Sequence, residues 1–242
     1  MFVLGKTDIG KFRDENQDRF RVSMIDDNTS VAVVCDGMGG AKSGGLAGDI
    51  ASDIVYERLC LSYRADMEPK SVKSLLVSAF SAANSVVYRR SHEEEENRGM
   101  GTTCVAALVH NDTASIASVG DSRAYLLNES GITQITNDHT VVEYLHSKGV
   151  INEDEMRSHR MKNLITRAIG IEESVDVDYF EIDIPHGSVI LICTDGLTNY
   201  CSDELIYSIV YKRPLEQATN ELIEYSNTRG GKDNITVVLI SR

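Results

Sequence analysis

Three apolar segments between residues 104 and 128 follow one another with very short connections, and this spacing restricts the fold more than any other feature. The segments are Cys104–Val109, Thr113–Val119 and Arg123–Asn128. Short connections rich in turn-forming residues join antiparallel neighbours, whereas parallel strands need crossovers of a dozen or more residues. The spacing therefore predicts an antiparallel meander and argues against a doubly wound parallel sheet.

Hydrophobic periodicity predicts the remaining elements. Further strands are expected at Val31–Cys35, Tyr179–Ile184, Val189–Cys193 and Ile235–Ile240. Helices are expected from Leu46 to Leu59, from an N-cap at Ser71 to Val87, over Asp203–Tyr211 with Ser202 as its cap, and over Leu215–Asn227. The charged segment Thr140–Asn163 is weakly periodic, and there we expect a short helix and a mobile excursion over one face. This order of elements is typical of an α+β domain with much antiparallel sheet.

The size and charge of the chain limit its class. Its 242 residues suit one large domain with a full core. The formal net charge of −13 disfavours nucleic acid and anionic membranes as partners. No apolar run approaches the roughly 18 residues of a membrane span, and the charged N-terminal region lacks a secretory signal core. The five cysteines form no C-x-x-C pair, so we expect small core residues kept reduced in the cytoplasm.

Four aspartates lie where an apolar run breaks into a turn of small residues: Asp36, Asp121, Asp195 and Asp233. A strand that ends in such a turn holds its carboxylate at a rigid edge, and a neighbouring glycine lets other backbone approach closely. Together with Asp18 upstream, they suggest carboxylates gathered from distant segments around hard cations. Oxygen-only ligands suit magnesium or manganese rather than zinc. We expect this metal site between two sheets, with helices outside.

Eight short motifs appear in the order seen in metal-dependent protein phosphatases of type 2C, and the chain resembles that family from about Thr7 to Val238. The minimal length and the Met after the first Asp-Gly are similar to bacterial members. The resemblance implies a four-layer α-β-β-α sandwich of two mainly antiparallel sheets with a binuclear metal site between them. It also implies one catalytic domain over residues 1–242. Because the segment at about 140–163 is charged and lies between two motif blocks, we expect it to form a flap beside the metal centre. The motifs are Arg13–Asp18, Asp36–Gly40, Gly101–Thr103, Gly120–Arg123, Asp138–His139, Thr166–Gly170, Asp195–Gly196 and Gly231–Thr236.

The resemblance implies hydrolysis of phosphoserine and phosphothreonine in proteins, with Mn²⁺ or Mg²⁺ as cofactor. Carried over residue by residue, Asp36 bridges two tightly bound metals, and the backbone carbonyl of Gly37 binds one of them. Asp195 and Asp233 bind the other metal, and Asp18 holds metal-bound water. A water that bridges two such cations loses its proton far below its free pKa of about 15.7, and so supplies hydroxide near neutral pH. No Cys, Ser or His nucleophile is required.

Further motif residues relate to the phosphate and to a weaker third metal. Arg13 is expected to clamp the phosphate, because a planar guanidinium suits its geometry better than a lysine. Asp121 is similar to the residue that, with Asp195, holds the third metal in bacterial members. Asn199 stands where some relatives have another Asp, so this site should be weak. Met38 replaces a His that can protonate the leaving group in eukaryotic members, and a thioether cannot do so.

Several of these roles have a structural alternative. Asp18 and Asp121 could only cap turns, and Arg13 could be a plain surface charge. His139 follows Asp138 in its motif, and for it a structural hydrogen bond is favoured over proton transfer. Four other motif residues are expected to support packing or the metal ligands: Thr102, Thr103, Thr166 and Arg167.

Other function classes fit the sequence less well. The stretch Gly37–Ser43 resembles a P-loop, but Asp36 and Ala41 occupy both positions where that motif requires glycine. A haloacid-dehalogenase-like phosphatase would use two carboxylates one residue apart, and Val34 stands two residues before Asp36. A catalytically inert binding module on the same fold would be expected to lose metal ligands, and the three core carboxylates are all present.

We therefore expect a serine/threonine protein phosphatase that opposes a bacterial Ser/Thr kinase, with that kinase among its phosphoprotein substrates. The runner-up is a partner-switching phosphatase that acts on a phosphorylated anti-sigma antagonist. The two differ only in their substrate, which a sequence does not identify. A cytoplasmic monomer without nucleic-acid or membrane partners is expected.

Overall fold

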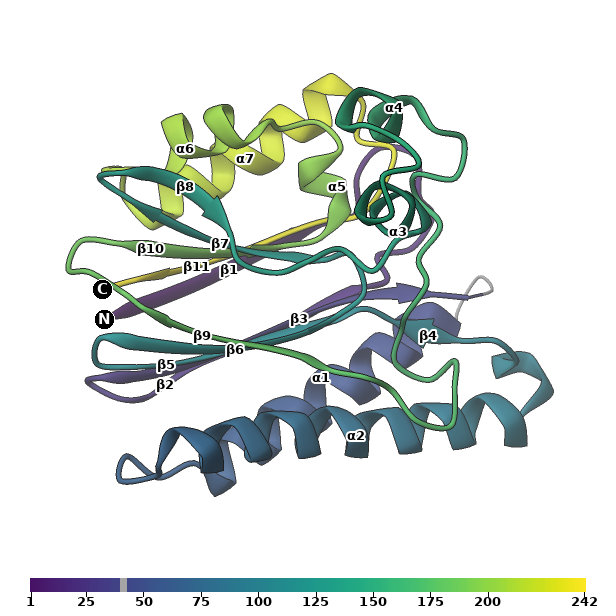
Figure 1. Cartoon of the computed structure of the whole chain (residues 1–242), viewed down its shortest axis with the longest axis horizontal. Coiled ribbons are helices and arrows are strands. Elements are labelled where there is room, and N and C mark those ends of the chain that lie inside the picture. Colours follow the sequence, from purple (N-terminus) through teal and green to yellow (C-terminus); the bar gives the residue numbers. More distant parts are fainter. Residues whose placement is uncertain (40–42) are drawn as a thin grey trace.

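The computed structural model describes residues 1–39 and 43–242 and arranges them in four layers (Figure 1). Two antiparallel sheets face each other. Helices α1 (Ser43–Ser62) and α2 (Pro69–Glu93) cover the outer face of one sheet, and α6 (Asp203–Val210) and α7 (Leu215–Arg229) cover the other. The predicted α-β-β-α sandwich is therefore confirmed. Among the described residues, no helix combines the length and the apolar character that crossing a membrane requires.

Each sheet is assembled from strands that are far apart in the chain. The first sheet has the order β1-β11-β10-β7-β8, and the second has the order β2-β3-β5-β6-β9, with β4 paired to β3. The strands of the first sheet are β1 (Phe2–Asp8), β7 (Arg123–Asn128), β8 (Gly131–Gln134), β10 (Val189–Cys193) and β11 (Ile235–Ser241). Those of the second are β2 (Asp18–Asp26), β3 (Thr29–Met38), β4 (Gly101–Thr102), β5 (Cys104–His110), β6 (Thr113–Val119) and β9 (Asp178–Asp183).

The predicted three-strand meander is only partly correct. Strands β5 and β6 form the expected hairpin, but β7 does not pair with β6. It crosses to the other sheet, where it lies between β10 and β8, while β9 takes the place beside β6. A three-residue connection can close a hairpin or step from one sheet to the next, and the spacing alone does not distinguish them. The crossing carries Asp121 into the gap between the sheets' ends.

The other predicted elements are found with small shifts, and the missed strands are either partly exposed or very short. No strand was predicted for β1, β2, β4 or β8. The side chains of β1 and β2 are mostly half-buried and mixed with charges, whereas β4 has two residues and β8 has four. Ser202 caps α6 as predicted, but Ser71 is not a cap, because α2 already begins at Pro69. Within 140–163 there are two short helices, α3 (Val141–Ser147) and α4 (Glu153–Ser158), rather than one. The 3₁₀ turn Glu95–Asn97 and the short α5 (Asp195–Thr198) were not predicted.

Alternation along β3 explains how the core leads to the candidate site. Val31, Val33 and Cys35 pack against the α1–α2 layer, whereas Ala32 and Val34 pack between the two sheets. Successive side chains of a strand point to opposite faces. The inward series therefore continues to the next alternate residue, Asp36. The five cysteines are free thiols, four of them buried, in agreement with the prediction of reduced core residues.

Candidate functional site

The predicted metal ligands come from strand ends that meet at one end of the sandwich, away from the chain termini (Figure 1). Asp36 lies near the end of β3 and Asp18 begins β2. Asp195 follows β10 directly, and Asp233 lies just before β11. Asp121 lies in the connection between β6 and β7. The two sheets thus contribute ligands from both sides of one region. Gly40 and Ala41, which entered the motif arguments, lie outside the described residues.

The backbone around Asp36 is held rigidly. Asp36 donates its N–H to Thr103 Oγ1 (2.9 Å), and its carbonyl accepts from Thr102 Oγ1 (2.9 Å). The next residue, Gly37, donates to the carbonyl of Gln17 (3.2 Å). A Cβ at Gly37 would lie 2.1 Å from the carbonyl oxygen of Gly44, so only glycine fits there. The two threonines thus support the ligand, as expected.

Asp18 lies directly opposite Asp36 across β2 and β3 and is only 2% exposed. Its Oδ2 accepts hydrogen bonds from Thr194 Oγ1 (2.9 Å) and Thr236 Oγ1 (2.7 Å). Its Oδ1 is buried and has no hydrogen-bond partner among the described residues. The local turn is closed by Asn16, whose Oδ1 accepts from the N–H of Asp18 (3.1 Å). This geometry favours a ligand role over turn capping for the Asp18 carboxylate.

Asp195 and Asp233 are brought together by a close backbone contact. A Cβ at Gly196 would lie 1.9 Å from the carbonyl oxygen of Asn234, so the two segments touch. Asp195 Oδ2 accepts from Asn199 Nδ2 (3.0 Å), and its Oδ1 is buried without a partner in the described part of the chain. Asp233 accepts from the N–H of Asn234 through Oδ1 (2.9 Å). Each carboxylate therefore keeps a fixed orientation.

The clustered carboxylates oppose one another's ionisation. Burial, together with neighbouring carboxylates, raises the pKa of Asp18 to about 7 and that of Asp195 to about 6. Burial likewise raises the pKa of Asp121 to about 7, and that of Asp36 well above its usual range. Buried like charges of this kind are compensated when a cation binds between them.

The donor set fits hard divalent cations. Within residues 1–39 and 43–242, no three His, Cys, Asp or Glu side chains already converge closely enough to hold one ion. The carboxylates nevertheless come from both sheets, interact electrostatically, and include two buried oxygens, on Asp18 and Asp195, that have no hydrogen-bond partner among the residues that the structure describes. All-oxygen sites of high negative charge suit Mg²⁺ or Mn²⁺. The residues therefore fit the metals expected from the sequence.

Arg13 lies in the loop between β1 and β2, at the rim of this region. One guanidinium nitrogen lies 2.7 Å from Asp233 Oδ2, and the side chain is 52% exposed. The hydrogen bond to Asp233 raises the pKa of Arg13, so its charge is permanent. A half-exposed guanidinium beside a metal-ligand candidate can reach an anion that approaches from solvent.

His139 supports the turn that carries Asp121. Gly120, with a positive φ of 105°, donates its N–H to His139 Nδ1 (3.0 Å), and the N–H of His139 donates to the Gly120 carbonyl (2.9 Å). On its other side, His139 Nε2 lies 3.3 Å from Asp178 Oδ2. Arg167 contacts the other oxygen of the same carboxylate, Asp178 Oδ1. Burial lowers the pKa of His139. The contacts agree with the favoured structural role rather than proton transfer.

Three residues at the site were missed by sequence reasoning: Thr194, Thr236 and Asn234. The signal lay in the alternation of the strands. Ile190 and Ile192 face the space between the sheets, and the next alternate residue on the same side of the strand is Thr194. On β11, the inward positions that include Val238 and Ile240 likewise extend back to Thr236. An inward-facing hydroxyl at the end of a buried strand indicates a polar partner in the gap.

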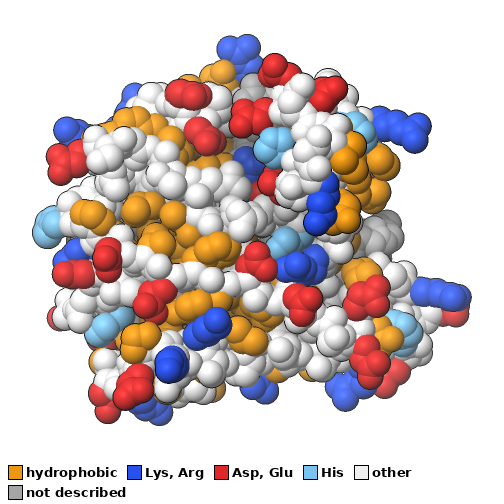
Figure 2. Space-filling view, viewed as in Figure 1, with side chains coloured by type: hydrophobic (Ala, Val, Ile, Leu, Met, Phe, Trp, Pro, Cys, Tyr) orange, Lys and Arg blue, Asp and Glu red, His pale blue; other side chains and the backbone are white. Residues whose placement is uncertain are grey.

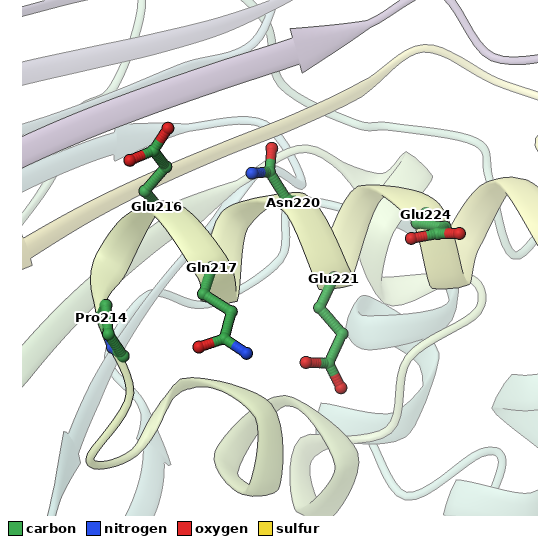
Figure 3. Close-up of a pocket in the computed structure, with 6 residues that line it drawn as sticks. All are labelled: Pro214, Glu216, Gln217, Asn220, Glu221 and Glu224. Atoms are coloured by element: carbon green, nitrogen blue, oxygen red, sulfur yellow. The ribbon is translucent and has the colours of Figure 1, made fainter.

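Two surface pockets lie away from these carboxylates. One, of about 600 Å³, lies on α7 and is drawn in Figure 3, where Glu216 and Asn220 project to one side of the helix and Gln217 and Glu221 to the other. Its three glutamates disfavour a phosphate ligand. The other, of about 400 Å³, lies at the end of α2 beside Gly170. On the face shown in Figure 2, Lys and Arg side chains are interspersed with Asp and Glu.

Comparison with known proteins agrees with this geometry. The family model described as protein phosphatase 2C matches residues 13–239. The serine/threonine phosphatase stp of Listeria monocytogenes serotype 4b is 35% identical over 241 residues, which is 98% of this chain and 94% of the relative. The crystal structure of Stp1 from Staphylococcus aureus has a TM-score of 0.92 and 33% identity, and covers 99% of this chain and 94% of its own.

A fourth comparison bears on the cofactor. The catalytic domain of the serine/threonine protein phosphatase PstP, solved in complex with 2 manganese ions, has a TM-score of 0.85 and 29% identity. The similarity covers 98% of this chain and 96% of that one. Its metal content is a property of that protein. Manganese is a hard cation, and the oxygen donors described above suit cations of that type.

Proposed function

The chain belongs to the protein phosphatase 2C family and is a metal-dependent serine/threonine protein phosphatase, and on this premise we propose which of its residues carry the reaction. Asp36, Asp195 and Asp233 would hold two Mn²⁺ or Mg²⁺ ions tightly, with Asp36 between them. The carbonyl of Gly37 would add a ligand, and Asp18 would hold water at the site. When bound, such ions supply a nucleophile from water near neutral pH and neutralise phosphoryl oxygens.

One observation carries this proposal: buried carboxylates from both sheets meet with oxygens that no described protein group satisfies. Asp18 Oδ1 and Asp195 Oδ1 are the two such atoms. A buried acceptor without a donor is costly, and a cation or an ordered water removes that cost. The rigid backbone of Asp36 and the two threonine hydroxyls on Asp18 keep these oxygens in place before any ligand arrives.

Arg13 would bind the phosphate group of the substrate. Its guanidinium is held beside Asp233 and is half exposed, so a phosphoprotein can reach it. A fixed, permanently charged fork provides two parallel donors for phosphate oxygens. The contact orients the phosphoryl group toward the carboxylate cluster, and the positive charge of the guanidinium partly offsets the negative charge of those carboxylates.

A third, weaker metal site would involve Asp121 together with Asp195. Asp121 is carried toward the cluster by the β6–β7 crossing, and its pKa is raised first by burial and then by Asp195. Asn199, where some relatives have an acid, donates a hydrogen bond to Asp195 and brings no charge of its own. A site with fewer charged oxygens holds a divalent cation less tightly.

We further propose a single catalytic domain over residues 1–242, with a flap at about residues 140–163 that is built from α3 and α4. Three large apolar side chains in or beside this flap are well exposed: Tyr144, Val150 and Leu164. In Figure 1, α3 and α4 lie toward the same end of the sandwich as α5. Segments that pack little apolar surface are the ones that move at binding sites.

The physiological substrates of the enzyme are phosphoproteins, and a Ser/Thr kinase is proposed among them. No observation favours the partner-switching phosphatase or the inert binding module. We propose a cytoplasmic monomer, and the free cysteines suit a reducing compartment. Phosphoproteomics of a strain without the gene tests the substrate assignment. Sites on a kinase should gain phosphate, whereas gains confined to an anti-sigma antagonist would favour the alternative.

The activity itself is tested with purified protein and a phosphothreonine peptide. Phosphate release is expected with added Mn²⁺ or Mg²⁺, and it should stop in excess EDTA and return when the metal is restored. Full activity in excess EDTA would falsify the proposed site, because the carboxylates would then act without cations.

A further inference from the structure

We propose that Asn234 positions the phosphate-binding Arg13, by holding both ends of the loop that carries it. The inference rests on the proposed role of Arg13 in binding the substrate phosphate. Asn234 is not a proposed metal ligand, and no contact with substrate is proposed for it. Its side chain points to the loop between β1 and β2. It is therefore a positioning residue and not a catalytic one.

The side-chain amide of Asn234 makes three hydrogen bonds to the backbone of this loop. Its Nδ2 donates to the carbonyl of Ile9 (2.9 Å) and to the carbonyl of Glu15 (3.1 Å). Its Oδ1 accepts from the N–H of Gln17 (2.8 Å). The residue is only 5% exposed, so water competes little for these bonds. One side chain thus satisfies backbone groups on both sides of Arg13.

The exposed middle of the loop, residues 11–14, lies outside any helix or strand. Phe12, next to Arg13, is 70% exposed and therefore anchors nothing in the core. A backbone bond joins the N–H of Lys11 to the carbonyl of Gly231 (2.7 Å). Other bonds lie toward the loop ends, where the N–H of Gly10 donates to Asp8 Oδ1 (2.9 Å) and Asn16 Nδ2 donates to Thr7 Oγ1 (2.9 Å). With Asn234 in place, the loop loses its conformational entropy when the protein folds. Without Asn234, the same entropy would be lost when phosphate binds, and phosphate binding would be weaker.

The same residue ties the loop to the metal-ligand segment. The N–H of Asn234 donates to Asp233 Oδ1, and Arg13 contacts Asp233 Oδ2 (2.7 Å). Gly10 has a φ of 79°, and a Cβ there would lie 2.3 Å from the carbonyl oxygen of Asp233. The loop therefore runs directly over Asp233. Asn234 therefore keeps Arg13 and the carboxylate cluster at a fixed position relative to each other. A phosphate bound between them requires this.

The test compares three variants by steady-state kinetics on a phosphothreonine peptide with saturating Mn²⁺. Asn234→Ala is expected to raise KM by about tenfold, with a fall in kcat of less than about threefold, because Arg13 binds phosphate in ground and transition states alike. Arg13→Ala should show the same split. In the double variant, the Asn234 change should add less than about twofold, since both act on one interaction.

Asn84 provides a matched control. It too is buried, and its side chain holds a loop by three bonds: Nδ2 to the carbonyls of Glu172 (3.0 Å) and Glu173 (3.2 Å), and Oδ1 from the N–H of Gly170 (2.8 Å). Asn84→Ala removes the same number of bonds from a loop without Arg13. It should lower the melting temperature about as much as Asn234→Ala and leave KM within about twofold of the wild type. An equal rise of KM in both would overturn the inference.

The outcomes separate this inference from the function on which it rests. If Arg13→Ala leaves KM unchanged, the proposed role of Arg13 is wrong. If Arg13→Ala raises KM and Asn234→Ala does not, only the role of Asn234 is wrong. Full additivity in the double variant, or weaker Mn²⁺ binding by Asn234→Ala in calorimetry, would also overturn it, because Asn234 would then act elsewhere. Should Asn234→Ala not fold, Asn234→Ser is measured in the same way.

Discussion

Thr236 on β11 donates its hydroxyl to Asp18 Oδ2 on β2 over 2.7 Å, and this bond joins the two sheets at the metal-ligand cluster. A second hydroxyl, from Thr194 at the end of β10, reaches the same oxygen (2.9 Å). Thr194 is the N-cap residue of α5, yet its side chain does not cap that helix. With Oδ2 occupied in this way, the carboxylate plane of Asp18 is fixed and Oδ1 is left for a ligand.

Replacing Thr236 by valine is expected to weaken Mn²⁺ binding. Valine keeps the shape of threonine but removes the donor, so Asp18 can rotate and one of its buried oxygens loses a partner. A loss of about 1–3 kcal/mol is typical for such a change, which corresponds to roughly 5- to 150-fold weaker binding. Titration calorimetry with Mn²⁺ measures it directly. Thr236→Ser, which keeps the hydroxyl, should bind nearly as the wild type does. Equal affinities for the valine and serine variants would mean that the hydroxyl does not orient Asp18.

Neutralising a core ligand is expected to abolish most turnover. Asp36→Asn, Asp195→Asn and Asp233→Asn should each lower kcat by roughly 10³-fold or more, because a lost ligand removes several kcal/mol of transition-state stabilisation. Asp27→Asn, at the exposed turn after β2, is the control and should be fully active. Circular dichroism checks that the fold persists. Near-normal turnover in any of the three, at saturating metal, would remove that residue from the proposed site.

Asp121→Ala is expected to slow a phosphopeptide more than an aryl phosphate. The prediction follows from the place of Asp121 beside Asp195 and from the absence of an acid at Met38. A serine alkoxide needs a proton to leave, whereas p-nitrophenolate does not. Both substrates are assayed on one preparation, after calorimetry has shown that two Mn²⁺ ions still bind tightly. Asp112→Ala, in the β5–β6 turn, serves as control. Equal losses on the two substrates would exclude a role in leaving-group protonation, and no loss on either would make Asp121 a turn residue.

His139 is expected to remove part of the stability that the metal-free protein gains as the pH falls below about 6.5. Burial, and then the charge of Arg167, lower the pKa of His139, while Asp178 and Asp138 oppose this shift. Below its usual pKa of about 6.5 the unfolded chain therefore binds more protons at this position than the folded chain does. The stability contributed by neutral His139 is complete above that pH and is lost as the pH falls toward the folded-state pKa. The raised pKa values of Asp18, Asp121 and Asp195 act in the opposite direction, so the contribution of His139 is read as a difference between two proteins. Urea unfolding in EDTA at pH 7.5 and pH 5 measures the change in stability, and the change toward pH 5 should be more favourable for His139→Asn, which keeps an acceptor but does not titrate. The same change in both proteins would contradict the assignment.

Strongly periodic segments could be predicted from the sequence, and partly exposed ones could not. The alternation of β9, the buried runs of β3, β10 and β11, and the helical faces of α1 and α7 are local properties, so their positions followed from spacing. Strands β1 and β2 carry mixed charges because each lies at the edge of its sheet, where only one side of the strand pairs with a neighbouring strand. Their existence depends on the partners β11 and β3, which lie elsewhere in the chain.

The sequence by itself determined the family, because eight motifs occur in a characteristic order, and it predicted the core carboxylates, because turns such as Asp36-Gly37 and Asp195-Gly196 are local signals. Only the tertiary structure decided how those carboxylates are held. Strand β7 joins the other sheet because Gly120 adopts a positive φ and is fixed by His139, which lies 19 residues further along the chain. The hydroxyls on Asp18 and the amide that holds the Arg13 loop come from Thr194 just after β10, Thr236 in β11 and Asn234 just before β11, from 176 to 225 residues away. Contacts at such separations leave no periodic trace in a sequence, since they depend on which strands become neighbours and not on the spacing within any one of them.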